Sequence, residues 1–161
     1  MTDEDIQIRR ASVADIPDIV RLRRMMFEAM GFRDPMALDA ADAANRAYFA
    51  RAVRLNEYRG WVAVTPDQRV VASGGLVLDR HPPGPENLGG RSAYIMNMAT
   101  DPDFRRRGLA RRIFAEIMTW VREHRITVAS LHATEPGRSL YAGFGFRPSN
   151  EMTTAACCAN G

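Results

Sequence analysis

The spacing of hydrophobic residues along the chain switches several times between alternation, which is typical of strands, and the three-to-four-residue spacing of helices. Each switch predicts a new helix or strand. Apolar and polar residues alternate over residues 6–10, which predicts a first strand. Apolar residues then recur at helical spacing, which predicts a helix that begins at Ser12 or Asp15 and ends at Gly31. An alanine-rich stretch predicts a second helix over residues 37–55.

The middle of the chain is rich in residues that favour strands. Two such runs within residues 60–78 flank the turn TPDQ, which predicts a β-hairpin. Residues 79–91 hold three prolines and three glycines, so they are expected to form a loop. A fourth strand is predicted over residues 92–100.

The C-terminal part begins with a strongly amphipathic pattern. Residues 108–124 predict a helix whose apolar face is formed by Leu109, Ile113, Ile117, Trp120 and Val121. A fifth strand over residues 126–134, a short helix over residues 137–144 and a further strand or half of a hairpin within residues 145–158 are expected to follow.

The elements together have the order β-α-α-β-β-β-α-β-α-β and predict an α/β fold. We expect one domain, residues 1–161, with a central mixed sheet and helices on both faces. The unit over residues 92–134 is strand, glycine turn, helix and strand, so its two strands are expected to be parallel.

Arginine dominates the charge pattern and favours an anionic partner. The net charge is +3 and the isoelectric point is about 9.3, with arginines gathered at positions 21, 23 and 24 and between 105 and 112. The first group is consistent with a solvated helix face, and the second surrounds a glycine. Two interpretations stay open from charge alone: a basic surface for nucleic acid, or a turn that binds a small anion.

Other residue patterns narrow the class of protein. Cys157 and Cys158 are adjacent, which suits neither a disulfide nor a C-x-x-C motif, and the three histidines are too scattered to predict a metal site. No apolar run approaches the roughly 20 residues that span a bilayer. The N-terminal MTDEDIQIRR is not a secretory signal. We therefore expect a soluble cytoplasmic protein without a metal.

The segment RRRGLA, residues 105–110, lies between a predicted strand and the start of a helix. The first four N–H groups of a helix have no acceptor inside it, and the helix dipole adds roughly half a positive charge there. Gly108 carries no Cβ where an anion would approach the backbone. Neither G-K-[ST] nor G-x-G-x-x-G is present. The segment thus predicts a site for a compact ligand that bears phosphate groups.

The same segment resembles the Q/R-x-x-G-x-G/A motif of the GNAT acyltransferase superfamily. It follows MATDPDF, which resembles the V-x-P-x-x-R motif at the end of the corresponding strand in this family. About thirty residues later, LYAGFGF resembles the family's Y-x-x-x-G-F signature. The order of elements is similar to that of the family over nearly the whole chain, most specifically over residues 94–152.

This resemblance implies acetyl-CoA as the acyl donor. The backbone amides of the glycine turn would bind the pyrophosphate, and the strand MNMAT would pair with the pantetheine arm in a gap between the fourth and fifth strands. The Met98 N–H would point at the thioester carbonyl, and Thr100 would bind a pantetheine amide. The implied cofactor-binding residues are Met98, Thr100, Arg105, Arg106, Arg107, Gly108, Leu109, Ala110 and Tyr141.

The resemblance also implies that Tyr141 is the general acid for the departing thiolate. The general base is less well defined, because the fourth strand carries no carboxylate where some family members have one. His132 is the first candidate, with Glu28, Glu151 or a chain of waters as alternatives. Glu28, Asn97 and Glu151 are expected to contact the acceptor.

The function expected from these observations is transfer of an acetyl group to a primary amine of a small molecule, or of a peptide or protein. The chain is expected to bind neither nucleic acid nor membrane, and a homodimer is possible. Two alternatives stay open. One is a module that binds acetyl-CoA without catalysis. The other is a basic nucleic-acid binder, although no aromatic residues interleave with the arginine run as base stacking requires.

Overall fold

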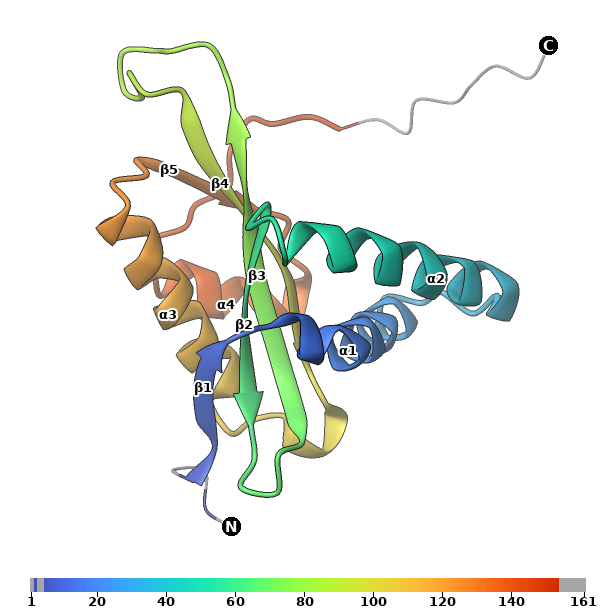
Figure 1. Cartoon of the computed structure of the whole chain (residues 1–161). Helices are drawn as coiled ribbons and strands as arrows, with labels where there is room; N and C mark the ends of the chain where they lie inside the picture. The colour runs from blue at the N-terminus through green and yellow to red at the C-terminus, as the bar shows by residue number, and fades with distance from the viewer. Residues whose placement is uncertain (1, 3–4, 154–161) are drawn as a thin grey trace, which may run out of the picture.

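The computed structural model describes residue 2 and residues 5–153, and its elements follow the predicted order as far as the last helix (Figure 1). The strands are β1 (Gln7–Arg10), β2 (Tyr58–Val64), β3 (Val70–Arg80), β4 (Arg91–Thr100) and β5 (Val128–Leu131). The α-helices are α1 (Ile16–Ala29), α2 (Pro35–Ala52), α3 (Leu109–Glu123) and α4 (Arg138–Ala142). Short 3-10 helices are η2 (Val13–Asp15), η3 (Pro102–Phe104) and η4 (Glu135–Gly137).

The strands form one mixed sheet. Their order in the sheet is β1-β2-β3-β4-β5, so each strand lies beside its neighbour in sequence. All neighbouring pairs are antiparallel except β4 and β5, which are parallel and are joined through α3. The predicted α/β fold class, the mixed sheet and the parallel βαβ unit are therefore confirmed.

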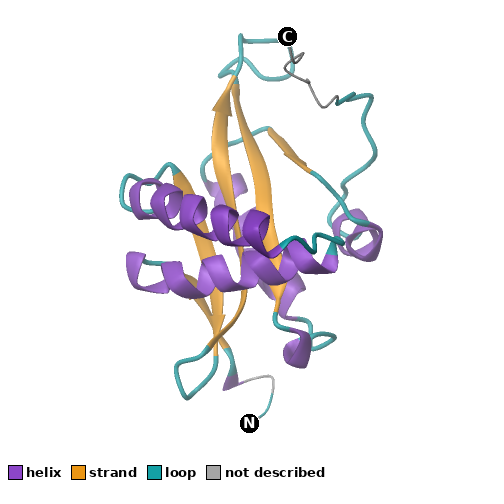
Figure 2. Cartoon of the chain, turned by 90° about the vertical axis from the view of Figure 1, so that its right-hand side faces the viewer, coloured by secondary structure: helices purple, strands orange, loops and turns teal. Residues whose placement is uncertain are grey.

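Helices cover both faces of the sheet (Figures 1 and 2). Helices α1 and α2 lie on one face, and α3 and α4 lie on the other. Helix α3 buries Leu109, Ile113 and Ile117, which are four residues apart, against the sheet. Helix α1 buries Ile19 and Val20 in a second core on the opposite face. Burial of each such side chain contributes about 1.5–3 kcal/mol, so these two apolar layers hold the helices to the sheet.

The predicted strand within residues 145–158 is not found in residues 145–153, and this part of the prediction is wrong. Pro148 has no N–H to donate to a neighbouring strand, and Met152 is 93% exposed. The segment therefore lacks the apolar face that would stabilise it on the sheet. Residues 154–161, which include Cys157 and Cys158, lie outside the described residues. The fifth strand is also shorter than the predicted 126–134.

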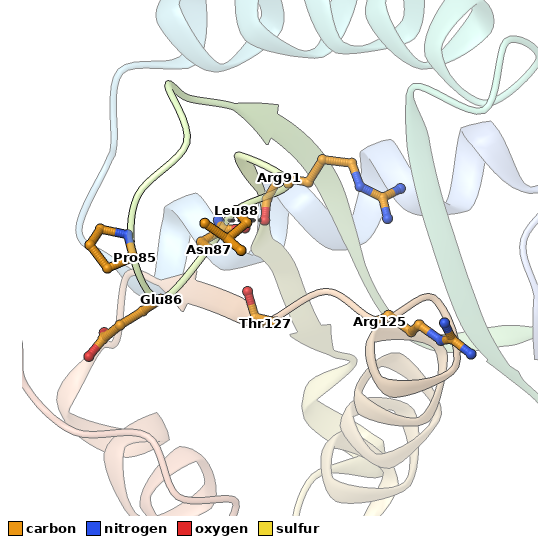
Figure 3. A pocket seen from close by; sticks show the side chains of 8 residues that line it. Pro85, Glu86, Asn87, Leu88, Arg91, Arg125 and Thr127 are labelled. Atoms are coloured by element: carbon orange, nitrogen blue, oxygen red, sulfur yellow. Dashed lines mark hydrogen bonds between the residues drawn. The ribbon is translucent and has the colours of Figure 1, made fainter.

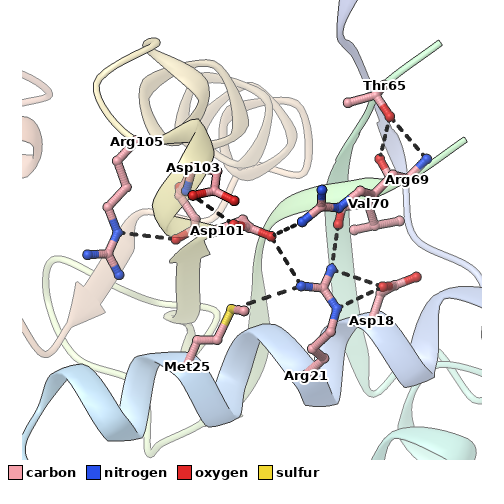
Figure 4. Close-up of polar contacts among 10 residues, drawn as sticks. Asp18, Arg21, Met25, Thr65, Arg69, Val70, Asp101, Asp103 and Arg105 are labelled. Carbon is pink, nitrogen blue, oxygen red and sulfur yellow. Dashed lines mark hydrogen bonds and ion pairs between the residues drawn. The ribbon is translucent and has the colours of Figure 1, made fainter. Parts of the chain in front are cut away.

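Asp101, directly after β4, is the centre of an ion-pair network that joins three elements (Figure 4). Its carboxylate is 3% exposed and accepts from Arg69 Nη2 at 2.6 Å and Arg21 Nη1 at 3.3 Å. Arg21 also donates to the Val70 carbonyl at 2.7 Å, which ties α1 to the start of β3. The other carboxylate oxygen accepts from the Asp103 N–H. The network thus fixes the point at which the chain leaves β4 and enters the glycine turn.

We expect Asp101→Asn to lower the free energy of unfolding by about 1.5–3 kcal/mol, because the change removes the negative charge that both arginines bind. Urea denaturation monitored by circular dichroism measures this. Asp103→Asn is the matched control, since Asp103 is exposed and contributes only its backbone N–H; it should stay within about 0.5 kcal/mol of the parent. Equal stability of the two variants would contradict a structural role for the network.

Candidate functional site

A β-bulge interrupts β4 in the middle of the predicted site. Ser73 pairs with Ala99, and Gly75 pairs with Met96, so β4 has one more residue than β3 over this stretch. Asn97 adopts the left-handed conformation with φ of 61°, which asparagine tolerates better than most residues. A bulge of this kind bends its strand and interrupts regular pairing.

Strands β4 and β5 separate at this bulge. Their pairing runs from Ser92 with Val128 to Ile95 with Leu131, and no residue of β4 beyond Ile95 is paired with β5 in the described structure. The pairing of β4 with β5 thus ends just before the bulge, as the gap that the family resemblance implied requires.

The separation leaves backbone groups of β4 facing the gap. The Asp101 N–H donates to the Val71 carbonyl at 2.8 Å, on the β3 side. Because donors alternate sides along an antiparallel strand, the N–H groups of Thr100 and Met98 lie on the opposite edge, from which β5 has diverged. The Met98 side chain packs elsewhere: its sulfur lies over Gly74, where a built Cβ would be 2.3 Å away. Met98 thus presents a backbone donor to the gap while its side chain fills the core.

The glycine turn has the backbone geometry of an anion site. Arg106 and Gly108 both have positive φ values, of 63° and 73°, and Gly108 is the N-cap of α3. The first helical hydrogen bond to the Gly108 carbonyl comes from the Arg112 N–H, so the amides of residues 109–111 have no acceptor within the helix. A Cβ placed on Gly108 would meet no atom within 4 Å. The helix N-terminus is therefore accessible to a ligand.

The arginine side chains of the turn are held in different ways. Arg105 Nε donates to the Thr100 carbonyl at 3.4 Å, and the Arg107 guanidinium lies over the Phe104 ring. Arg105 and Arg106 are exposed. Positive charge therefore surrounds the same amides that the helix dipole favours for an anion.

Tyr141 lies on α4, next to the α3 face of the sheet. Its ring packs against Phe114, with ring centroids 5.1 Å apart, and its hydroxyl has no hydrogen-bond partner in the described part of the chain. Burial raises the pKa of the Tyr141 phenol, so the group stays protonated at neutral pH. The Tyr141 ring is thus held by packing, and its protonated hydroxyl is available to donate to a ligand.

The remaining predicted residues are spread over two faces. His132 directly follows Leu131, the last residue of β5 paired with β4, and it is exposed. Glu28 is on α1, where Arg24 Nε binds it at 3.2 Å. Glu151 is exposed and does not lie on a strand, contrary to the expectation for it. The structure thus places His132 at the opening between β4 and β5, and it does not bring Glu151 into a sheet there.

Asn97 is buried at the bulge and faces the α1 side. It is 3% exposed, and its Nδ2 donates to the Tyr58 hydroxyl at 3.3 Å, whereas its Oδ1 has no partner among the described residues. Burial raises the pKa of Tyr58 to about 12, against the opposing effects of the Asn97 hydrogen bond and of the nearby Arg23 charge.

Arg23 belongs to the same region and was missed as a site residue by sequence reasoning. Its Nε is buried without a hydrogen-bond partner, and its guanidinium lies 4.8 Å from the centre of the Phe27 ring. A signal was available, because Arg23 follows Ile19 by four residues and Val20 by three and so continues the buried stripe of α1.

A surface pocket of about 320 Å³ lies away from these residues (Figure 3). It is lined by the loop between β3 and β4 together with Arg125 and Thr127. Neither the glycine turn nor the bulge contributes to its lining. The candidate site is therefore defined by an open strand edge and a helix N-terminus rather than by this hollow.

Residue 2 and residues 5–153 contain no cluster of three or more His, Cys, Asp or Glu side chains arranged to hold a metal ion. Among the same residues, no helix combines the length and the apolar character needed to span a bilayer.

Comparison with known proteins identifies the family. Solved structures similar to this chain include a GCN5-related N-acetyltransferase from Ralstonia eutropha JMP134, with 31% identity, a TM-score of 0.84 and coverage of 92% of this chain and 97% of that one. A predicted acetyltransferase with acetyl-CoA from Clostridium acetobutylicum has 26% identity and a TM-score of 0.82, with coverage of 92% and 94%.

Glucosamine-6-phosphate N-acetyltransferase from Arabidopsis thaliana, at 15% identity and a TM-score of 0.65 over 94% of this chain and 99% of that one, shares the fold. No curated protein matches the sequence. Residues 17–146 match the acetyltransferase (GNAT) family. Since that match covers most of the chain and agrees with the bulged β4, its divergence from β5 and the glycine turn, the protein belongs to the GNAT acetyltransferase family.

Proposed function

We propose that the protein transfers the acetyl group of acetyl-CoA to a primary amine by direct attack in a ternary complex. The observation that carries this proposal is the continuity between two features. The β4 edge left open by β5 runs directly into the glycine turn at the start of α3. An extended ligand that pairs with the strand edge would therefore reach the turn with its phosphate groups.

The donor would bind along this path in three parts. The amides and arginines of residues 105–110 bind the pyrophosphate, and Thr100 pairs with the pantetheine arm. The Met98 N–H then donates to the thioester carbonyl oxygen. The similarity to the Clostridium acetobutylicum protein, whose structure is described with acetyl-CoA, supports this donor.

The reaction needs three groups to act on the thioester. A neutral amine attacks the carbonyl carbon, and negative charge develops on the oxygen that the Met98 N–H binds. The intermediate collapses as the C–S bond breaks, and Tyr141 donates its proton to the leaving thiolate. The amine loses one proton to water or to His132, which lies at the open end of β5. The products are the N-acetylated amine and CoA.

We expect Tyr141→Phe to lower kcat at least about tenfold, which corresponds to about 1.4 kcal/mol of transition-state stabilisation, with little change in acetyl-CoA affinity. Release of the CoA thiol measures the rate. Tyr94→Phe is the matched control, because Tyr94 lies on β4 before the bulge, where β4 is still paired with β5. An unchanged kcat in Tyr141→Phe would exclude the general-acid role.

Acetyl-CoA at about 100 times its Kd should stabilise the protein by about 2.7 kcal/mol, which is a rise in Tm of roughly 5–10 °C. Gly108→Asp should remove most of this rise, because a carboxylate would stand at the pyrophosphate site and α3 would lose its αL cap residue. Differential scanning fluorimetry with and without acetyl-CoA measures both effects.

Gly31→Asp is the control for that variant, since Gly31 also has a positive φ and open space around its Cβ. It should lose intrinsic stability yet keep the shift. A shift that survives in Gly108→Asp would place the pyrophosphate elsewhere. A normal shift without acetylation of any amine would favour a protein that senses acetyl-CoA.

A further inference from the structure

Helix α1 carries a cation, Arg23, that has no counter-ion among the described residues. Arg23 continues the stripe of Ile19 and Val20, both of which are buried. Its Nε makes no hydrogen bond within the part of the chain that the structure describes, and desolvation lowers the pKa of its guanidinium. Holding a positive charge in such a place costs free energy unless an anion compensates it.

The acidic side chains around α1 are already bound by the two neighbouring arginines. Arg21 pairs with Asp18 and Asp101. Arg24 pairs with Glu28, Asp39 and Asp42, at 3.2, 2.7 and 2.7 Å. Among the described residues no ion pair involves Arg23, and its guanidinium lies over the face of the Phe27 ring, so its charge is available to an anionic ligand.

A second unsatisfied polar group lies in the same region. The Asn97 amide is 3% exposed, and only one of its two ends has a partner, the Tyr58 hydroxyl. Tyr58 packs in the core formed with Ile19 and Val20 of α1, and the charge of Arg23 acts on its hydroxyl. A buried amide oxygen without a donor is unfavourable, and a donor group on a ligand would satisfy it.

The position of Asn97 relates this region to the reaction. It immediately precedes Met98, whose N–H faces the gap expected to hold the thioester. A donor bound to the Asn97 oxygen would therefore lie close to the reacting carbonyl. Arg23 belongs to α1, which covers the face of the sheet opposite α3 and α4, and Tyr141 belongs to α4.

We propose that the acetyl acceptor is an amino acid, a molecule with both an amine and a carboxylate, whose carboxylate binds Arg23 and whose amine donates to the Asn97 side-chain oxygen. This inference rests on the proposed acetyl transfer. The planar fork of one guanidinium matches a carboxylate in two hydrogen bonds. A single arginine also matches the single charge of a carboxylate better than the double charge of a phosphate monoester.

The test compares acids with their amides as acceptors. L-alanine, L-methionine, L-phenylalanine and 4-aminobutyrate are each assayed beside the corresponding carboxamide, at saturating acetyl-CoA, by release of the CoA thiol. Amidation makes an α-amine less basic and so leaves more of it neutral. A preference for the acid therefore cannot arise from the protonation state of the amine. We expect kcat/KM to favour at least one acid over its amide by tenfold or more.

Substitution of Arg23 supplies the second readout. Arg23→Gln should lower kcat/KM for the preferred acid about tenfold to a hundredfold, mainly through KM, and leave its amide unchanged. Arg23→Lys should recover part of the lost kcat/KM, because lysine keeps the positive charge but cannot form the two parallel hydrogen bonds of a guanidinium. Arg46→Gln is the matched control, an exposed arginine of α2, and should behave as the parent. If Arg23→Gln does not fold, the ratio of kcat/KM for the acid to kcat/KM for its carboxamide in the parent protein tests the inference.

The outcomes separate the two proposals. One outcome is that acetyl-CoA raises Tm while no acid is acetylated faster than its carboxamide, either because the two react equally, because the carboxamide reacts faster or because neither reacts. In that case the amino-acid inference is overturned and donor binding stands. If acetyl-CoA neither raises Tm nor releases its thiol with any acceptor, the proposed acetyl transfer itself fails. An acid preference that persists in Arg23→Gln would place the carboxylate on another group and overturn the role of Arg23.

Discussion

One extra residue in β4 is the constraint on which the rest of the site depends. With a bulge at Asn97, β4 turns away from β5, and the two strands stay paired only as far as Ile95 and Leu131. Unbroken pairing would consume the N–H groups of Met98 and Thr100 within the sheet. A sheet edge with unpaired donors is unfavourable unless something binds it. The site therefore depends on the absence of β4–β5 hydrogen bonds beyond Ile95, which leaves the N–H groups of Met98 and Thr100 for a ligand.

The bulge depends on two glycines in the neighbouring strand. A Cβ on Gly74 would lie 2.3 Å from the sulfur of Met98, and a Cβ on Gly75 would lie 2.3 Å from the hydroxyl of Tyr58. Both side chains need the space above β3 that only glycine leaves. Gly74 and Gly75 of β3 thus allow the irregular part of β4 to pack on both faces of the sheet.

This dependence explains which features the sequence could predict. Helices α1 and α3, the apolar face of α3, the hairpin and the position of the RRRGLA turn before α3 follow from local periodicity and from backbone rules, and they were predicted correctly. The bulge could not be placed, because alternation does not reveal where a strand takes up an extra residue. Arg23 was hidden in a run of arginines, although its spacing from Ile19 marked it. The last strand was expected from the residue pattern within residues 145–158, but Pro148 cannot donate to a neighbouring strand and Met152, the apolar side chain of residues 147–153, is exposed.

The arrangement of charge follows from the same geometry. The glycine turn holds positive charge beyond the C-terminal end of β4, and Arg23 holds it on α1, which covers the other face of the sheet from α3. In the proposed complex each would bind an anionic part of one reactant. The negative charges of both reactants would then be neutralised away from the thioester. Two negative charges then develop at the thioester: that of the carbonyl oxygen, which the Met98 N–H would stabilise, and that of the leaving sulfur, which Tyr141 would protonate.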